Sequence, residues 1–534
     1  MKLIVSLAQL IFKPARVSSV AQKVFSLVIL SMTMVTLQAC SQPMNNYDPW
    51  RVPESGENSP THTLAAPTAA QEPTKAPLLT LTPAPAGPTP TPNQPAILPT
   101  LRTETTLYVV QSGDSLAKIA LSHQVSVAQI LAVNEDIEDP NLIEPDQELT
   151  IPPASANELA TSFKIIPDSE LVYSPSAVGF DTASAVEQFN GKLTTYTEKL
   201  DDGSQLTGAQ VVQRVADEFS VNPRLLLAVL EYRSGWLTGQ VSSESTTDYP
   251  LGLRDSNRKG LYKQLSWAAN EMTRGYTLWE QKSLAVWTLT DGEVMRIDPT
   301  INGGTAGLQY MLALLLGKDE WKQAVSETGF YATYQNLFGF PFTFAIEPLV
   351  PADISQPELS LPLAEGDTWY LTGGPHVGWG TGSAWAGLDF APPGEEYGCY
   401  DSDTPVLAAA DGLIVRSENG AVVLDLDGDG IEQTGWSLLY MHIATEGRVS
   451  VGIYVEEGDL IGYPSCEGGY STGTHLHIAR RYNGVWIAAD SATPFVLSGW
   501  VASGTGVEYD GYLDKDGQTV EAFNGRADFN AISR

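Results

Sequence analysis

Two histidines separated by a single residue stand in the stretch GTHLHI (473–478). They are His475 and His477, in a chain of 534 residues that has only six histidines. Successive side chains of a β-strand point to opposite faces, so residues two positions apart share one face. Imidazole is a common metal ligand, and two rings on one face both need partners. The stretch therefore predicts a metal-binding face on a strand.

Further side chains that bind metals precede this stretch. Asp389 lies between Leu388 and Phe390, where an unpaired carboxylate would cost free energy that a cation removes. His376 comes before it in GGPH, and His442 ends the apolar run LLYMH. Three nitrogen or oxygen ligands and a water molecule form the open tetrahedral arrangement of catalytic zinc. Such an ion lowers the pKa of its water to about 7 and polarises a carbonyl group.

The order His, Asp, His, His-x-His resembles the M23 family of zinc peptidases, the lysostaphin-like group. The resemblance spans roughly residues 360–495 and rests on GPH, LDFA, YMH and GTHLHI. It implies Zn²⁺ held by His376, Asp389 and His477. It also implies that His475 is the general base or proton shuttle and that His442 stabilises the oxyanion. One departure is Trp385, which stands where many members carry the first histidine, four residues before the aspartate.

Cys399 and Cys466 are the only cysteines after residue 40. One follows Asp389 and the other precedes the His-x-His stretch. In an oxidising compartment such a pair predicts a disulfide that braces the groove. Thiolate ligation of zinc is the alternative.

The stretch DLDGDG places Asp425, Asp427 and Asp429 at alternating positions before Gly430. This pattern begins like a Ca²⁺-binding loop. The twelfth position is Trp436, where an EF-hand needs a glutamate. A hairpin tip with acidic surface residues is therefore the alternative to a calcium site.

The elements that must position these residues differ along the chain. From residue 358 the sequence alternates short apolar runs with turn signals, which predicts antiparallel β-sheets for the peptidase domain at 358–497 and a β extension at 498–534. Residues 160–350 have helical periodicity, with helices expected over 262–282, 306–317 and 319–327.

The helical region contains VNPRLLLAVLEYRSGWL (221–237), which faintly resembles the first active-site helix of lysozyme-like transglycosylases. The catalytic glutamate of that family corresponds to Arg233, and Glu231 lies two residues earlier. An arginine stays protonated and cannot act as a general acid. A spacer or substrate-binding domain on a lysozyme-like scaffold is therefore favoured over a muramidase.

Residues 105–153 predict a strand, two helices and a second strand, with Ser115 as the first helix cap. The stretches VVQSGDSLAKIA and LIEPDQELTIP resemble a LysM domain, a family that binds glycans containing N-acetylglucosamine. The resemblance implies two glycan-binding loops, with the residues Gly113, Asp114, Ser115, Leu116, Asn141, Leu142 and Ile143. A small packing domain that has lost glycan binding is the alternative.

The first 39 residues have a basic start and an apolar run, as in a signal peptide. The run ends in LQAC, which resembles the lipobox of bacterial lipoproteins and implies a lipid-anchored Cys40 in an extracytoplasmic protein. An uncleaved signal anchor is the alternative. Residues 40–104 are rich in proline and threonine, which predicts a disordered linker.

The net charge of −33 argues against a nucleic-acid partner. Together the segments predict a lipid-anchored zinc endopeptidase that cleaves a peptide bond of peptidoglycan and is held on the glycan by LysM. A non-catalytic wall-binding scaffold, or an activator of other hydrolases, is the rival interpretation.

Overall fold

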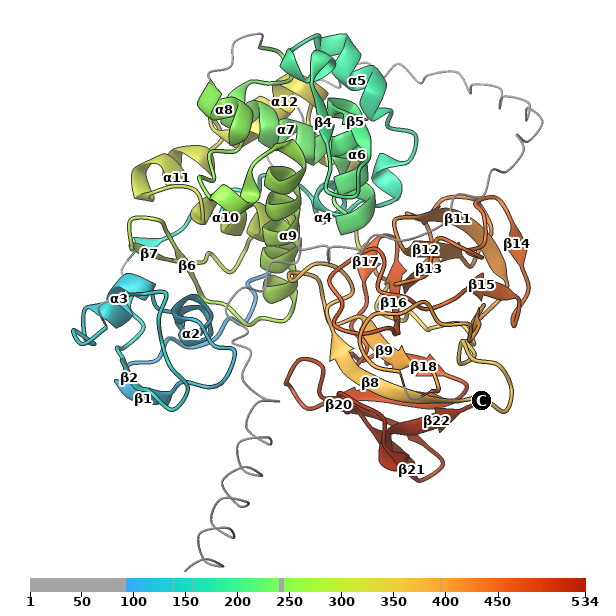
Figure 1. Ribbon diagram of the computed structural model, residues 1–534. Coiled ribbons are helices and arrows are strands. Elements are labelled where there is room, and N and C mark those ends of the chain that lie inside the picture. Colours follow the sequence, from blue (N-terminus) through green and yellow to red (C-terminus); the bar gives the residue numbers. More distant parts are fainter. Residues whose placement is uncertain (1–92, 138, 157, 240–243, 395) are drawn as a thin grey trace, which may run out of the picture.

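The computed structural model describes residues 93–534, except 138, 157, 240–243 and 395. It shows the predicted multidomain arrangement: a small βααβ unit, a mainly helical region and a mainly β region, in chain order (Figure 1). The leader, Cys40 and most of the predicted linker lie outside the described residues. Among the helices that are described, none is both long and apolar enough to cross a membrane.

The small unit follows the predicted order. Its elements are β1 (Thr106–Val109), α2 (Leu116–His123), α3 (Val127–Leu131) and β2 (Glu148–Ile151), with β1 and β2 antiparallel. Ser115 caps α2, because its hydroxyl accepts a hydrogen bond from the N–H of Lys118. Asn134 ties α3 to β2: its amide donates to the carbonyls of Ile130 and Thr150 and accepts from the Thr150 N–H.

The end of the predicted linker is ordered, which corrects the expectation that disorder extends to residue 104. The N–H groups of Asn93 and Ala96 donate to the carbonyls of Thr300 and Pro299 in the helical region. Ala96 and Leu98 also pack against the helical core. The apolar residues in this stretch let it bury surface that the preceding Pro- and Thr-rich sequence does not offer.

The helical region surrounds one buried core. Its elements are β3 (Glu158–Leu159), α4 (Asp168–Leu171), η1 (Pro175–Ala177), α5 (Thr182–Phe189), η2 (Lys192–Thr195), β4 (Thr197–Lys199), β5 (Gln205–Thr207), α6 (Gly208–Phe219), α7 (Pro223–Ser234), α8 (Glu244–Asp248), η3 (Ser256–Arg258), α9 (Leu261–Glu280), β6 (Val286–Thr288), β7 (Val294–Arg296), α10 (Gly303–Ala313), α11 (Lys318–Ala324), α12 (Phe330–Phe338) and η4 (Pro341–Phe344). The three helices expected at 262–282, 306–317 and 319–327 correspond to α9, α10 and α11. Every residue of α7 from Leu225 to Leu230 is buried, as expected of a helix enclosed by others.

Helices α9 and α10 pack with their backbones close together, because each carries a glycine at the crossing. A Cβ atom on Gly275 would lie 2.5 Å from the Cβ of Tyr310, and one on Gly307 would lie 2.5 Å from the carbonyl oxygen of Met272. Larger side chains at these two positions would push the helices apart. This packing holds α9 closely against α10, and α9 lies on the side of the helical region that faces the β region (Figure 1).

A buried ion pair lies inside the helical core. The guanidinium of Arg224 in α7 donates to both carboxylate oxygens of Glu170 in α4, over 3.1 and 2.6 Å. The hydroxyl of Tyr334 in α12 also donates to Glu170. These contacts join three helices that are distant in sequence, and each charge compensates the burial of the other.

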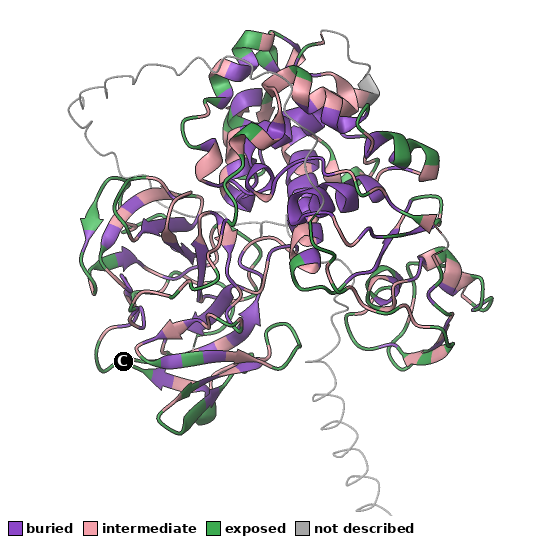
Figure 2. Cartoon of the chain, turned by 180° about the vertical axis from the view of Figure 1, so that it is seen from behind, coloured by how far each residue is buried: buried purple, intermediate pink, exposed green. Residues whose placement is uncertain are grey.

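The β region is built on a nine-stranded sheet with the strand order β14-β11-β12-β13-β16-β9-β8-β22, and β17 pairs with β16. The strands are β8 (Thr368–His376), β9 (Gly387–Ala391), β11 (Gly412–Glu418), β12 (Ala421–Asp425), β13 (Trp436–Met441), β14 (Tyr454–Val455), β16 (Leu476–Tyr482), β17 (Val485–Trp486) and β22 (Ala531–Ser533). Strands β10 (Val406–Leu407) and β15 (Leu460–Gly462) form a separate pair. The central strands are buried on both faces, and exposed residues gather in the outer loops (Figure 2).

The C-terminal extension is part of this β region. Its strands β19 (Trp500–Gly504), β20 (Gly511–Lys515) and β21 (Gln518–Glu521) form one sheet with β18 (Val496–Leu497) of the preceding domain, and η5 (Asp528–Asn530) follows. Its last strand, β22, then pairs with the edge strand β8, with Ile532 opposite Trp369. The extension therefore covers an edge that would otherwise present unpaired backbone groups.

We expect Glu170→Ala to lower the free energy of unfolding of the full chain by about 3–5 kcal/mol, because it leaves the Arg224 guanidinium buried without its carboxylate. Chemical denaturation followed by circular dichroism measures the effect. Glu187→Ala, on the exposed face of α5, is the matched control and should change stability by less than about 0.5 kcal/mol. Equal effects of the two variants would contradict the assignment.

Candidate metal centre

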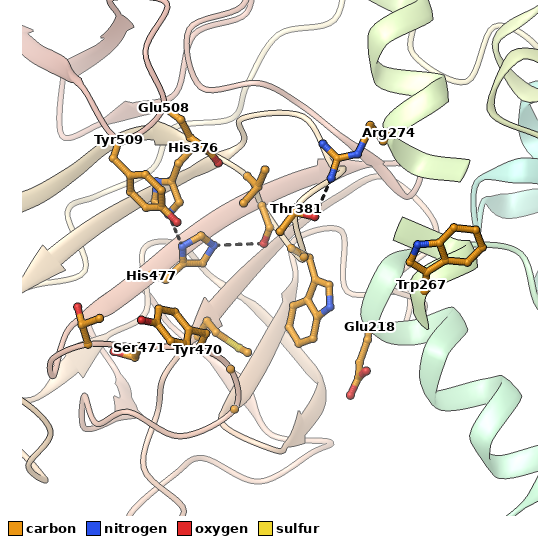
Figure 3. Close-up of a pocket in the computed structure, with 18 of the residues that line it drawn as sticks. Glu218, Trp267, Arg274, His376, Thr381, Tyr470, Ser471, His477, Glu508 and Tyr509 are labelled. Carbon is orange, nitrogen blue, oxygen red and sulfur yellow. Dashed lines mark hydrogen bonds between the residues drawn. The ribbon is translucent and has the colours of Figure 1, made fainter. Parts of the chain in front are cut away.

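Three adjacent strands bring the predicted ligands together. His477 in β16 lies directly opposite Asp389 in β9, and His376 at the end of β8 lies opposite Gly387 at the start of β9. His477 lies 88 residues after Asp389 and 101 residues after His376 in sequence, yet sheet pairing makes the three neighbours. Figure 3 shows His376 and His477 facing each other.

The donor atoms of the three residues converge on one point. His376 Nε2 and His477 Nδ1 lie 2.9 Å apart, and Asp389 Oδ1 is 3.2 and 3.0 Å from these two nitrogens. Ligands about 2.0–2.2 Å from a tetrahedral zinc ion are separated by about 3.3 Å. The three residues form a buried group that could hold a metal ion. Their spacing therefore fits a small tetrahedral cation.

The hydrogen bonds behind the rings fix which nitrogen faces the centre. His376 Nδ1 donates to the carbonyl of Gly374 over 2.8 Å, and His477 Nε2 donates to the carbonyl of Gly378 over 3.2 Å. A carbonyl can only accept, so these nitrogens carry the protons. When both rings are neutral, the lone pairs of the other two nitrogens point at each other and at the carboxylate, an arrangement that a bound cation stabilises.

The pKa values of the three candidate ligands are shifted in different directions. Burial would raise the pKa of Asp389, but the neighbouring His376 and His475 outweigh it and hold that pKa well below its usual range. Burial lowers the pKa of His477, so this ring is neutral at neutral pH. Burial also opposes protonation of His376, but the charge of Asp389 outweighs it and raises the pKa of His376. The centre thus combines an ionised carboxylate with a neutral imidazole, as metal ligation requires.

The two predicted catalytic histidines lie beside the centre. His475 Nδ1 donates to the carbonyl of Gly473 over 2.8 Å, and its Nε2 faces Asp389 Oδ1 at 3.5 Å. His475 and His477 thus share one face, as the sequence predicts. The ring of His442 lies 4.5 Å from that of His475, between centroids. His442 has a φ angle of +64°, which turns the chain just after β13.

The environment of His442 sets its protonation. Its Nδ1 donates to the carbonyl of Glu467 over 2.9 Å. Burial, together with the neighbouring His475 and His477, lowers the pKa of His442 well below its usual value. The resting ring is therefore neutral and presents the lone pair of Nε2 toward the site. It can stabilise an oxyanion only after it has taken up a proton.

The sequence reasoning missed Tyr509, which comes from the β19–β20 loop of the C-terminal extension. Its ring stacks on His376 with centroids 4.2 Å apart and an interplanar angle of 21° (Figure 3). The backbone holds it there, because Gly374 N–H donates to the Tyr509 carbonyl and Tyr509 N–H donates to the Pro375 carbonyl. No spacing in the sequence marks this tyrosine; a signal would have required knowing that the extension folds back onto β8.

Cys399 and Cys466 form the predicted disulfide, with Cα atoms 5.6 Å apart. The alternative that one of them ligates the metal as a thiolate is therefore wrong. The disulfide links the segment after β9 to the segment before β16, and both line the cleft around the metal group. It braces the wall of that cleft, as expected.

The metal group opens into a cleft of about 3490 Å³ lined by residues of all three parts of the chain. Of the predicted glycan-binding residues, Gly113, Asp114 and Ser115 line this cleft. Asp114 orders their loop by accepting from the Tyr108 hydroxyl and the Gln111 N–H. Asn141, Leu142 and Ile143 lie on the neighbouring loop, whose base is joined to this one by the bond from Asp146 N–H to the Val110 carbonyl.

Leu116 corrects part of the glycan prediction. It is 2% exposed and belongs to the hydrophobic core of the small unit. As the first residue of α2, its apolar side chain turns inward to pack rather than outward to a ligand.

The acidic stretch after β12 gathers the carboxylates of Asp425, Asp427 and Asp429. Asp425 is buried and accepts from the Gly430 N–H over 2.9 Å, while the other two are exposed. Burial raises the pKa of Asp427 to about 6. Calcium binding here stays a prediction from the sequence.

Glu231 and Arg233 in α7 have structural partners. Glu231 accepts hydrogen bonds from the N–H groups of Leu237 and Thr238, just after the helix ends. Arg233 donates to the carbonyl of Leu251 over 2.9 Å. These contacts support a scaffold role for this helix and give no support to a muramidase.

Three family matches cover the described domains. Residues 108–152 match the LysM domain, residues 164–351 match the LasA N-terminal domain, and residues 385–489 match Peptidase family M23. The chain carries an M23 peptidase domain. The M23 match contains Asp389, His442, His475 and His477 and begins after His376. The helical region is thus similar to a domain that accompanies such a peptidase.

The chain is also similar to individual curated proteins. Protease LasA of Pseudomonas aeruginosa strain UCBPP-PA14 is 28% identical over 299 residues, which cover 52% of this chain and 66% of LasA. Beta-lytic metalloendopeptidase of Achromobacter lyticus is 28% identical over 173 residues, covering 30% of this chain and 43% of the relative. The chain thus spans just under two thirds of the length of LasA.

Solved structures also match part of the chain. The M23 metalloprotease pseudoalterin matches with 24% identity and a TM-score of 0.28, over 34% of this chain and 100% of its own. The catalytic domain of lysostaphin from Staphylococcus simulans matches with 29% identity and a TM-score of 0.17, over 23% of this chain and 87% of its own.

We expect His477→Ala to weaken zinc binding by more than about 100-fold, because loss of a partner behind a ligand already costs about 10–100-fold. Competition with a chromophoric chelator measures the zinc dissociation constant of the full chain. His123→Ala, in the LysM domain, is the control and should bind zinc like the unmodified protein. Unchanged zinc binding in His477→Ala would refute the ligand set.

Proposed function

We propose that this protein is a zinc-dependent endopeptidase that hydrolyses a peptide bond in the stem or cross-bridge of peptidoglycan. The observation that carries the proposal is the convergence of His376, Asp389 and His477 beside two further histidines in an M23 domain. Zinc bound by these residues would supply Lewis-acid polarisation of the scissile carbonyl and acidification of water. The names LasA protease and beta-lytic metalloendopeptidase belong to relatives and support a peptidase.

The chain's own residues provide the remaining steps. His475 presents the lone pair of Nε2 on the same face as the ligands, so it accepts a proton from the attacking water and passes it to the leaving amine. His442 stabilises the oxyanion once Nε2 carries a proton. The braced cleft around Cys399–Cys466 holds the extended peptide against these groups.

The LysM domain supports the choice of substrate. Its loop residues Gly113, Asp114 and Ser115 line the cleft that also contains the candidate metal group. Binding of a glycan strand there raises the effective concentration of the attached peptides at the peptidase domain. A peptide joined to N-acetylglucosamine-containing glycan fits both domains at once.

We expect His475→Ala to keep its zinc and to lower kcat by about 10²–10⁴-fold, the usual contribution of a general acid or base. The assay is the release of new amino groups from isolated cell walls by the full chain, and a chelator should stop it. Release of amino groups by the chelated protein would contradict zinc dependence. A zinc-loaded protein that binds walls and releases no amino groups would favour the non-catalytic scaffold.

We also propose that Cys40 is lipidated and that the proline-rich linker carries the folded domains away from an extracytoplasmic membrane surface. The LQAC stretch and the preceding apolar run support this proposal. Cys40→Ser expressed in a bacterial host should move from the membrane fraction to the soluble extracytoplasmic fraction or stay as an unprocessed precursor. Labelling with a radioactive fatty acid should be lost; labelling of Cys40→Ser would overturn lipidation at this residue.

A further inference from the structure

A glycine-rich loop lies between two of the candidate ligands, His376 and Asp389. It has the sequence VGWGTGSAW (377–385) and follows His376 directly. Three glycines in nine residues leave the free loop a large conformational entropy. Its internal bonds join the two arms below the tip: Gly378 N–H donates to the Ala384 carbonyl, Trp379 N–H donates to the Ser383 hydroxyl, and that hydroxyl donates to the Trp379 carbonyl.

The tip of this loop is held by helix α9 of the helical region. Asn270 accepts from the Thr381 N–H over 2.8 Å and donates to the Thr381 hydroxyl over 3.0 Å. Arg274, one turn further along α9, donates to the same hydroxyl over 2.7 Å (Figure 3). Thr381 is thus bonded through its backbone and its side chain to a different domain.

Close backbone packing accompanies these bonds. A Cβ atom on Gly382 would lie 2.1 Å from the carbonyl oxygen of Asn270, and one on Gly380 would lie 2.6 Å from the Asn270 side-chain oxygen. The ring of Trp379 meets Phe219 of α6 edge to face, with centroids 6.4 Å apart. The glycines therefore permit the loop to lie directly on the helix.

The same loop orients a metal ligand. The carbonyl of Gly378 accepts a hydrogen bond from Nε2–H of His477, and this bond orients the Nδ1 atom toward the centre. Gly378 lies against the ring of Trp486, since a Cβ atom there would be 2.5 Å from it. A displacement of the loop would move this carbonyl and rotate or release His477.

We propose that Asn270 and Arg274 are positioning residues of the metal centre: helix α9 holds Thr381, and the held loop orients His477. This inference rests on the proposed zinc site and names a role for the helical region in it. Because α9 packs closely against α10, the side chains of Asn270 and Arg274 hold the glycine-rich loop in one position.

Other contacts join the same two regions without touching the loop. Ser220 donates to the carbonyl of Gly484 over 2.7 Å, and Asn483 donates to the carbonyl of Leu349 over 2.8 Å. Loss of one such bond weakens the interface but leaves Thr381 in place. They provide a control that separates positioning of the metal centre from simple adhesion of the domains.

The test compares the full chain with Thr381→Ala, Asn270→Ala, Thr381→Ser and Ser220→Ala. We expect the first two to raise the zinc dissociation constant about 10-fold, the lower end of the range for residues behind a ligand. Thr381→Ser keeps the hydroxyl and should bind zinc normally, as should Ser220→Ala. In the metal-free protein, hydrogen exchange of the 377–384 segment should be faster in Asn270→Ala than in the unmodified chain. In Ser220→Ala it should be unchanged.

Thermal unfolding of all four variants controls for folding. Zinc affinity that stays unchanged in Thr381→Ala and Asn270→Ala, or that falls equally in Ser220→Ala, overturns the positioning role alone. Tighter zinc binding or faster cleavage in Thr381→Ala and Asn270→Ala also overturns it, because α9 would then restrain the site. A full chain that binds no zinc overturns both this inference and the proposed function.

Discussion

The cross-strand pairing of His477 with Asp389 is the interaction on which the functional site depends. Asp389 is an ionised carboxylate in a buried position. Without the neighbouring histidines, the burial of this charge would cost free energy. Around that carboxylate the fold supplies three histidines within 3.5 Å of one oxygen. The outer nitrogen of each ring donates a hydrogen bond to a backbone carbonyl. The inner nitrogens of His376 and His477 can then bind a cation together with Asp389.

The rest of the peptidase domain protects this arrangement. The C-terminal extension pairs β22 with β8 and lays Tyr509 over His376, which closes one side of the centre. The disulfide braces another side. On the third side a glycine-rich loop carries the carbonyl that orients His477, and this loop lies on α9. The candidate metal centre thus draws on elements from two domains.

Much of the site could be predicted because metal ligation demands particular side chains. The spacing of His475 and His477 defines a strand face, and the apolar neighbours of Asp389 mark an unusual carboxylate. The βααβ order and the Ser115 cap follow from local signals that tertiary contacts do not override. The ordered residues 93–104 and the buried Leu116 were mispredicted, because burial of short apolar stretches depends on which surface lies next to them.

The sequence alone determined the types of candidate ligand, the class of each domain and the two cysteines available for a disulfide, since these follow from residue chemistry and short-range periodicity. Only the tertiary structure decided that His376 reaches the centre in place of a histidine at Trp385, because the register of β8 against β9 sets that distance. It also decided the placement of Tyr509 and of the Thr381 loop. Those contacts join segments more than a hundred residues apart, and no local pattern records which surfaces will meet.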